Sequence, residues 1–179
     1  ISVFETAINE LGDFIAEREL IEAEASRELA EAVRAREEEI RVQREGQARA
    51  QQTANQALAP LLKQKLPVTI TTFLHSYWRD VLQGRIFSSG PDGAPFREAL
   101  QSALELIWSV GSKKEADERR RQVALLPGLL KRLNAGLDEI GVTADERKAF
   151  MDTLVELQLA ALRAEKHVEP KTARPAGAP

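Results

Sequence analysis

Residues 66–110 read LPVTITTFLHSYWRDVLQGRIFSSGPDGAPFREALQSALELIWSV, and this stretch decides the fold. It holds both tryptophans, the only tyrosine and three of the six phenylalanines of the 179-residue chain. Aromatic side chains bury the most apolar area per residue, so a chain with few of them is expected to build its core where they cluster. We therefore expect the core to form around two helices in this stretch and the loop between them.

The pattern of apolar residues predicts where these two helices begin and end. Pro67 fits the first turn of a helix, and apolar residues then recur at helical spacing until Gly84, which is predicted to end the helix. The composition of residues 90–93, GPDG, predicts a loop, and a second helix is predicted over residues 95–110. Phe87 falls in the predicted loop after Gly84, where it either plugs the core or contacts a partner, and we expect the plug.

The rest of the body is predicted to consist of further amphipathic helices, which makes the chain all-α. Leucines at helical spacing predict helices over residues 116–126 and 128–140, with a kink or break at Pro127 because proline removes a backbone donor. Thr143 and Glu146 fit a capping box that begins a last helix over residues 144–165. The predicted body, residues 66–165, is thus a bundle of about four to five helices. Its expected core anchors are large side chains: Phe73, Tyr77, Trp78, Leu104, Trp108, Leu133, Phe150 and Leu154.

Residues 1–58 are predicted to form a long, acidic helical arm that precedes the body and partly projects from it. They hold 13 of the 28 acidic residues but only 7 of the 25 basic ones. Apolar residues recur in the arm at the three- and four-residue spacing of an amphipathic helix, first closely and then more thinly: Phe4, Ile8, Leu11, Ile15, Leu20, Ile21, Leu29, Val33 and Ile40. A continuous helix of this length would span about 80 Å, which is more than the body can cover. The alternatives are an ordinary charged linker helix, or a break at Gly12 or Gly46.

The composition of the chain is that of a globular helical protein and excludes several kinds of site. The chain is 43% hydrophobic and 30% charged, and its net charge of −3 gives no reason to expect a nucleic acid or an anionic membrane as partner. The absence of cysteine excludes disulfides and thiolate zinc sites. No apolar run approaches the roughly 18 residues of a membrane span, and we expect a cytoplasmic protein.

The two ends of the chain suggest that it is part of a longer protein. It begins at Ile1 rather than at a methionine, and residues 167–179 are rich in proline and alanine. Such a composition predicts a disordered tail or an interdomain linker. We therefore expect a fragment of a larger protein.

The order of several short motifs carries a family resemblance. These motifs are Leu66-Pro67, Phe73-Leu74, Trp78, FREAL at residues 96–100, LIWSV at 106–110, LLP at 125–127, Leu129-Leu130, Leu133, Gly136-Leu137 and Ile140-Gly141. In this order they resemble the bacterial domain-of-unknown-function family number 1631, over about residues 66–165. The resemblance implies the helical fold, a domain with a further N-terminal part, and no established reaction. Family members often have a histidine where this chain has Gln158, so no role of that histidine is carried over.

The residues themselves do not predict a catalytic, cofactor or metal site. His75 and His167 are the only histidines, and His75 has no second ligand at helical spacing, so we interpret it as a surface residue. The chain has no glycine-rich phosphate loop, no nucleophile elbow and no HExxH motif. The thymidine phosphorylase label that some family members carry gains no support from these residues, and we expect no enzyme activity.

Basic residues around the third connection between helices are the best candidates for contacts to a small anion: Lys113, Lys114, Arg119, Arg120 and Arg121. Guanidinium groups form paired hydrogen bonds with phosphate or carboxylate, and a helix N-terminus favours an anion. However, Glu115, Asp117 and Glu118 lie among them. The three arginines also point in different directions at about 100° per residue, so a solvated run of charges is the simpler interpretation.

Two functions fit these observations. The first is a non-catalytic interaction or regulatory module, which binds a protein partner or a second copy through the N-terminal helix. The alternative is a module that binds a small anion, nucleotide or second messenger through the basic residues at 113–121. DNA binding through the corner at residues 141–143 is disfavoured because Asp145 and Glu146 would repel phosphates there, so no nucleic-acid partner is predicted.

Overall fold

The computed structural model describes residues 2–163, and every regular element in that range is helical. In chain order these are α1 (Ser2–Leu62), α2 (Val68–Phe73), the π-helical segment η1 (Leu74–Trp78), α3 (Arg79–Ser89), α4 (Ala94–Val110), α5 (Ala116–Glu139) and α6 (Ala144–Arg163). Because α2, η1 and α3 follow one another without a break, the described residues form five helices. The prediction of an all-α fold, with a long N-terminal helix followed by a packed set of helices, is confirmed.

The chain divides into two compact units, Ile1–Gly46 and Gln47–Pro179. Within the described range, the first unit consists of residues 2–46 of α1. Alanine, glutamate and arginine favour a helix here, and ion pairs one turn apart add a few tenths of a kcal/mol each, such as Arg18–Glu22 at 3.3 Å and Arg41–Glu45 at 3.0 Å. The helix is unbroken, so the alternative of a break at Gly12 or Gly46 is wrong.

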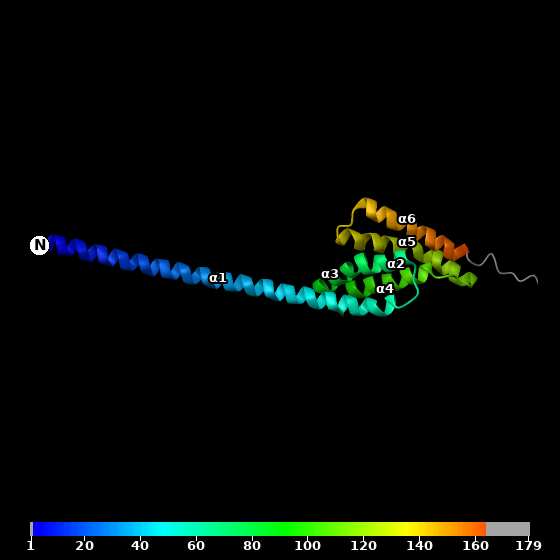
Figure 1. Ribbon diagram of the computed structural model, residues 1–179, viewed down its shortest axis with the longest axis horizontal. Coiled ribbons are helices and arrows are strands. Elements are labelled where there is room, and N and C mark those ends of the chain that lie inside the picture. The colour runs from blue at the N-terminus through cyan, green and yellow to red at the C-terminus, as the bar shows by residue number, and fades with distance from the viewer. Residues whose placement is uncertain (1, 164–179) are drawn as a thin grey trace, which may run out of the picture. The chain divides into compact units, whose positions relative to one another are not determined.

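The second unit contains the core. Its first element is the end of α1, which buries Ala50, Ala54, Leu58 and Leu61 at helical spacing. These side chains belong to one cluster of buried residues together with side chains of α2 to α6. Figure 1 shows α2 to α6 side by side in this unit. The compact body therefore begins within α1, before the boundary at residue 58 that the sequence suggested.

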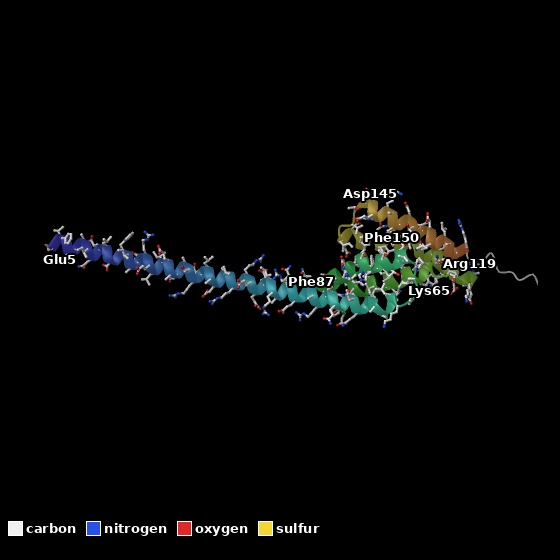
Figure 2. The ribbon with its side chains drawn as sticks, viewed as in Figure 1. Glu5, Lys65, Phe87, Arg119, Asp145 and Phe150 are labelled. Atoms are coloured by element: carbon white, nitrogen blue, oxygen red, sulfur yellow. The ribbon has the colours of Figure 1, made fainter. Side chains whose placement is uncertain are left out.

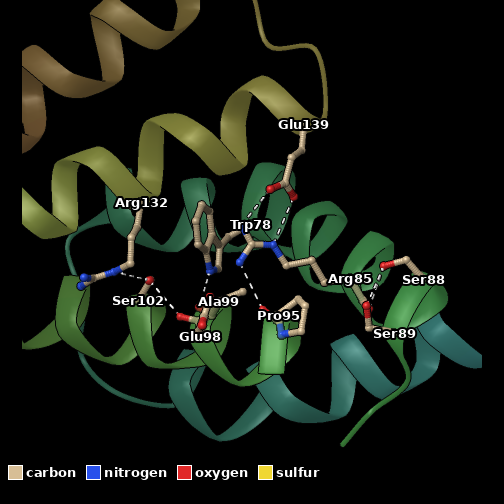
Figure 3. Close-up of polar contacts among 10 residues, drawn as sticks. All are labelled: Trp78, Arg85, Ser88, Ser89, Pro95, Glu98, Ala99, Ser102, Arg132 and Glu139. Atoms are coloured by element: carbon tan, nitrogen blue, oxygen red, sulfur yellow. Dashed lines mark hydrogen bonds and ion pairs between the residues drawn. The ribbon is translucent and has the colours of Figure 1, made fainter. Parts of the chain in front are cut away.

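Phe73 and Trp78 of the 68–89 helix form an aromatic group in this core together with Phe150 of α6. The rings of Phe73 and Phe150 stack with centroids 3.9 Å apart, and Phe73 also stacks on Trp78 at 5.7 Å. The indole Nε1–H of Trp78 donates to the carbonyl oxygen of Ala99 at 2.9 Å, which ties η1 to α4 (Figure 3). Among the expected core anchors, Phe73, Trp78, Leu133 and Leu154 are buried, and Tyr77, Trp108 and Phe150 are partly buried.

Leu104 is not a core residue, and the prediction that it anchors the core is wrong. Its side chain is 42% exposed, whereas α4 buries Phe96, Ala99, Ala103 and Leu106. The buried face of α4 thus lies about one residue, or 100°, away from the row of larger side chains that the sequence suggested. Small residues face the core because they let the neighbouring helices approach closely.

The helix that begins at Val68 is longer than predicted. It does not end at Gly84 but continues through α3 to Ser89, and Gly90 then turns the chain with a φ of 80°. Phe87 therefore lies on a helix rather than in a loop, and its side chain is 46% exposed. The prediction that Phe87 plugs the core is wrong.

Pro127 does not interrupt α5, which is continuous from Ala116 to Glu139, so the predicted division there is wrong. Val123 and Pro127 are both exposed, so the carbonyl group that loses its donor at the proline lies on the solvent side of the helix. The predicted capping box of α6 is confirmed, with the Thr143 N–H donating to Glu146 at 3.2 Å and the Glu146 N–H donating to Thr143 Oγ1 at 3.4 Å. The predicted tail, residues 167–179, lies outside the described residues.

Candidate functional site

Lys113, the first of the predicted anion contacts, ends helix α4 instead of facing solvent. The residue is only 2% exposed, and its Nζ donates to the carbonyl oxygens of Trp108 and Gly111. The same atom lies 4.2 Å from the centre of the Trp108 ring. The last carbonyl groups of a helix lack hydrogen-bond donors within the helix, and the Lys113 amine supplies a donor to them. Burial lowers the pKa of its amine, while nearby Glu118 opposes that change.

The acidic residues of the same connection begin helix α5. Glu115 is the N-cap residue, and its side chain and that of Glu118 accept each other's backbone N–H in a capping box. Glu118 accepts N–H groups from Lys114 at 2.9 Å and from Glu115 at 3.2 Å. The N–H groups of Glu115 and Lys114 hold the pKa of the Glu118 carboxyl below its usual value. The carboxylates of Glu115 and Glu118 therefore stabilise the N-terminal end of α5.

The remaining basic side chains do not converge on one pocket. Trp108 and Lys113 line a cleft of about 410 Å³, whereas Arg119 and Arg120 line a separate hollow on α5 with Val123. Arg121 places its guanidinium 5.3 Å from the Trp108 ring centre. Arg120 forms an exposed ion pair with Asp117 at 3.4 Å, and Arg119 donates to the Lys113 carbonyl at 3.5 Å. Lys114 is exposed. An anion site at Lys113, Lys114 and Arg119 to Arg121 stays a prediction, and the contacts described for these side chains do not favour it.

The polar contacts around Trp78 hold α3, α4 and α5 together. Arg85 donates from Nε and Nη2 to the two carboxylate oxygens of Glu139, at 3.1 and 2.9 Å, and from Nη1 to the Pro95 carbonyl at 3.1 Å (Figure 3). On the other side of the indole, Arg132 donates to Ser102 Oγ at 3.0 Å. Paired bonds of this kind fix geometry, and these side chains position helices rather than form an open site.

A buried network of amide and hydroxyl groups links α4, α5 and α6, and the sequence did not predict it. Gln122 Nε2 donates to the Ser109 carbonyl at 2.8 Å and to the Gln158 carbonyl at 3.4 Å. Gln158 Nε2 donates to Ser109 Oγ at 3.1 Å, and Gln122 Oε1 has no partner. Gln122 shares the buried face of α5 with Leu129 and Leu133, so a polar residue in an apolar row was the signal that could have revealed the network.

Two apolar surfaces of the described chain are open to solvent. One is a groove of about 460 Å³ between α2, η1 and α6, lined by Val68, Tyr77 and Phe150 among others. The other, which we call the α1 stripe, is a row of side chains in the first unit, from 47% to 72% exposed except for the partly exposed Ile40: Phe4, Ile8, Leu11, Ile15, Leu29, Val33 and Ile40. Figure 2 shows the side chains along α1, with Glu5 near its start.

The directions of the α1 stripe side chains follow from helix geometry. At 100° per residue its members fall within about 60° of one another around the helix. The stripe is therefore one face, although Arg18, Glu22 and Ser26 interrupt it in the middle. Phe14, Leu20 and Ile21 are exposed as well but point to its side or away from it.

The structure places no metal centre or membrane segment among these residues. Within residues 2–163, the acidic and histidine side chains form no group of three or more that could hold a metal ion. In the same range, no helix has both the length and the apolar composition needed to cross a membrane. His75 is exposed on η1, and His167 lies outside the described residues.

Comparison with known proteins gives a family but no characterised relative. Residues 40–155 match the family model described as "Protein of unknown function (DUF1631) third domain". No curated protein and no solved structure matches the chain. The match spans more than half of the chain, from late α1 to the middle of α6, and includes the core described above. The chain therefore belongs to the DUF1631 family and contains the third domain of that family.

Proposed function

We propose that the chain is a non-catalytic helical interaction module, and that the α1 stripe is its docking surface. The observation that supports this is the exposure of large apolar side chains along one face of the first unit, including Phe4 at 72% and Leu29 at 67%. Burial of one such side chain is worth about 1.5–3 kcal/mol. A partner helix that covers the row would gain that free energy several times over, which is enough for specific binding.

The second unit supports the same proposal in a different way. Several of its basic side chains are engaged at helix ends or in ion pairs, as Lys113 and Arg85 show, and its buried apolar side chains form one cluster. The second unit thus acts as a folded support, and the α1 stripe supplies the contacts. We find no specific observation that favours the alternative of a nucleotide-binding module.

Site-specific photo-crosslinking tests the proposal directly. The full chain would carry benzoylphenylalanine in place of Leu11, which is in the α1 stripe. The matched control carries it in place of Asp13, which is also exposed but lies about 200° around the helix. We expect protein adducts from the Leu11 probe in the producing cell and few from the Asp13 probe. Equal yields from the two positions, or no adduct from either, would overturn the proposal.

A further inference from the structure

Six of the seven apolar residues of the α1 stripe are arranged as mirror pairs about residue 22. Three pairs have residue 22 as their midpoint: Phe4 and Ile40, Leu11 and Val33, and Ile15 and Leu29. All six point to the same face of one α-helix. Two copies of this segment in antiparallel orientation would therefore place these six residues opposite one another, whereas Ile8 would lie opposite Arg36.

The charges of this segment also differ between its two halves. Residues 2–26 hold seven acidic residues and one basic residue, whereas residues 27–46 hold six acidic and five basic residues. A parallel pair would place a charge of −6 beside another −6. An antiparallel pair places the −6 half beside a half with a net charge of −1, so the charges favour the antiparallel orientation.

Charged residues beside the stripe mirror each other in the same way. Glu5 and Arg41 lie on the same side of it, with residue 23 as midpoint. In an antiparallel pair these two residues form an opposite-charge contact, and the contact occurs twice by symmetry. The like-charged pair, Glu22 with its own copy, lies at the centre, where Arg18 already contacts Glu22 at 3.3 Å within each helix.

Much of the remaining negative charge of the segment points away from the stripe. Glu17, Glu24, Glu31, Glu38 and Glu45 recur every seven residues. At 100° per residue they lie within about 50° of the direction opposite the stripe. In a pair of helices that covers the stripe, these carboxylates would face solvent on the outer sides, where salt screens charges beyond about 8 Å.

We infer that the occupant of the α1 stripe is a second copy of the same segment, which pairs with it as an antiparallel two-helix coil centred near Glu22. This inference rests on the proposed function and names its partner. The polar residues at the centre give the pair its register, since a shift would place Arg18 or Glu22 against apolar side chains. The paired stretch, from residue 4 to residue 40, is about 55 Å long and covers roughly 600 Å² per copy, near the lower end for specific interfaces.

Cysteine crosslinking tests the orientation, because the chain has no cysteine of its own. One preparation of the full chain carries Leu11→Cys and a second, of different mass, carries Val33→Cys. Antiparallel pairing brings these positions within the Cβ–Cβ distance of a disulfide, about 3.5–4.5 Å. We expect a mixed disulfide in the mixture and little product from the Leu11→Cys chain alone. A parallel pair would crosslink Leu11→Cys to itself and would overturn the inference.

A charge exchange tests the same pairing without changing the apolar face. Sedimentation equilibrium on the full chain, at concentrations up to roughly 100 µM, gives the dimer affinity. We expect Glu5→Arg to weaken the dimer about two- to tenfold, and Arg41→Glu to do the same, with affinity restored in large part by the two changes together. Failure of the double variant to recover affinity would count against the proposed register.

The outcomes separate this inference from the proposed function. A chain that stays monomeric while its Leu11 probe crosslinks to a different protein would overturn the second copy as partner but leave the docking surface in place. A monomeric chain whose Leu11 probe crosslinks to nothing would overturn both. A dimer that forms equally well after Leu11→Glu and Val33→Glu would place the contact elsewhere and would also overturn both.

Discussion

Gly136 on α5 is a residue where one methyl group would disturb the core. A Cβ atom there would lie 2.6 Å from Cζ3 of Trp78 and 3.3 Å from Cγ1 of Val81. The indole cannot easily move aside, because its N–H donates to the Ala99 carbonyl on α4. The absence of a side chain at residue 136 is therefore what lets α5 approach η1 so closely.

Replacement of this glycine should destabilise the protein even though alanine is the better helix former. We expect Gly136→Ala to lower the free energy of unfolding by about 1–2 kcal/mol, since overpacking costs roughly 1–3 kcal/mol and the helix gains up to about 1. Urea denaturation followed by tryptophan fluorescence measures this. Gly84→Ala on α3 is the control, because no atom lies within 4 Å of its added methyl group, and it should stabilise by about 0.5–1 kcal/mol. The same gain in both variants would contradict the packing argument.

Single residues were predictable from the sequence where size and apolarity decided their position. Phe73 and Trp78 are buried as expected, because large aromatic side chains remove the most apolar surface from water when they are buried. Leu104 and Lys113 were not predictable, because their positions depend on which face of α4 meets its neighbours and where that helix ends. A buried lysine is indistinguishable in sequence from an exposed one.

At the level of elements, the π-helical segment η1 explains how one helix keeps its apolar face inward over 22 residues. The buried residues of α2 and η1 include Ile70 and Leu74, and those of α3 include Leu82 and Ile86. At 100° per residue the second group would drift around the helix by about 120°, a third of a turn, relative to the first. The wider turn of the π-helix rotates each residue less and so removes this drift.

This account predicts that one exposed residue of η1 is dispensable. A π-helical turn corresponds to one residue inserted into an α-helix, so deletion of Ser76 should leave a regular α-helix with the same buried face. We expect the deletion variant to fold with a melting temperature within about 5 °C of the parent. Deletion of Ala135 from the regular helix α5 is the control, since it rotates Leu137 by about 100° away from Leu133 and should unfold the body. Thermal melts followed by circular dichroism compare the two.

Element types were predictable because the apolar spacing is helical throughout, but several element ends were not. Gly84 and Pro127 are usual helix breakers, yet both lie inside helices at solvent-exposed positions, where the lost propensity or hydrogen bond costs least. Packing of the opposite face outweighs that cost. Gly141, by contrast, ends α5 with a φ of 71°, and there the local signal and the fold agree.

At the scale of the whole molecule, stability should reside in the second unit. The core side chains lie between Ala50 and Leu154, and the family match covers nearly the same range, residues 40–155. A chain that begins at residue 47 should melt within about 2 °C of the full chain at low concentration. A chain that begins at residue 63 lacks Ala54 and Leu58 and should melt about 10 °C or more lower. Equal melting temperatures for the two truncations would show that the end of α1 is not part of the core.

The division of the molecule was only partly predictable. The sequence indicated an exposed acidic helix followed by a compact body, because the charge and the aromatic residues are unevenly distributed. It did not indicate that the last turns of the same helix, with Ala50 and Ala54, belong to the core, because alanine is common on both buried and exposed helix faces.

The buried hydrogen bond from Gln158 Nε2 on α6 to Ser109 Oγ on α4 limits which helix can occupy the place of α6. A shift of α6 by one turn, about 5.4 Å, would place Leu154 or Leu162 where Gln158 lies and remove the hydrogen bond that Ser109 Oγ accepts from its amide group. Hydrophobic packing alone tolerates such slippage, since one leucine resembles the next. The Gln158 side chain instead favours a single alignment, so a leucine-rich helix from a foreign protein could not replace α6 during assembly without leaving this hydrogen bond unmade.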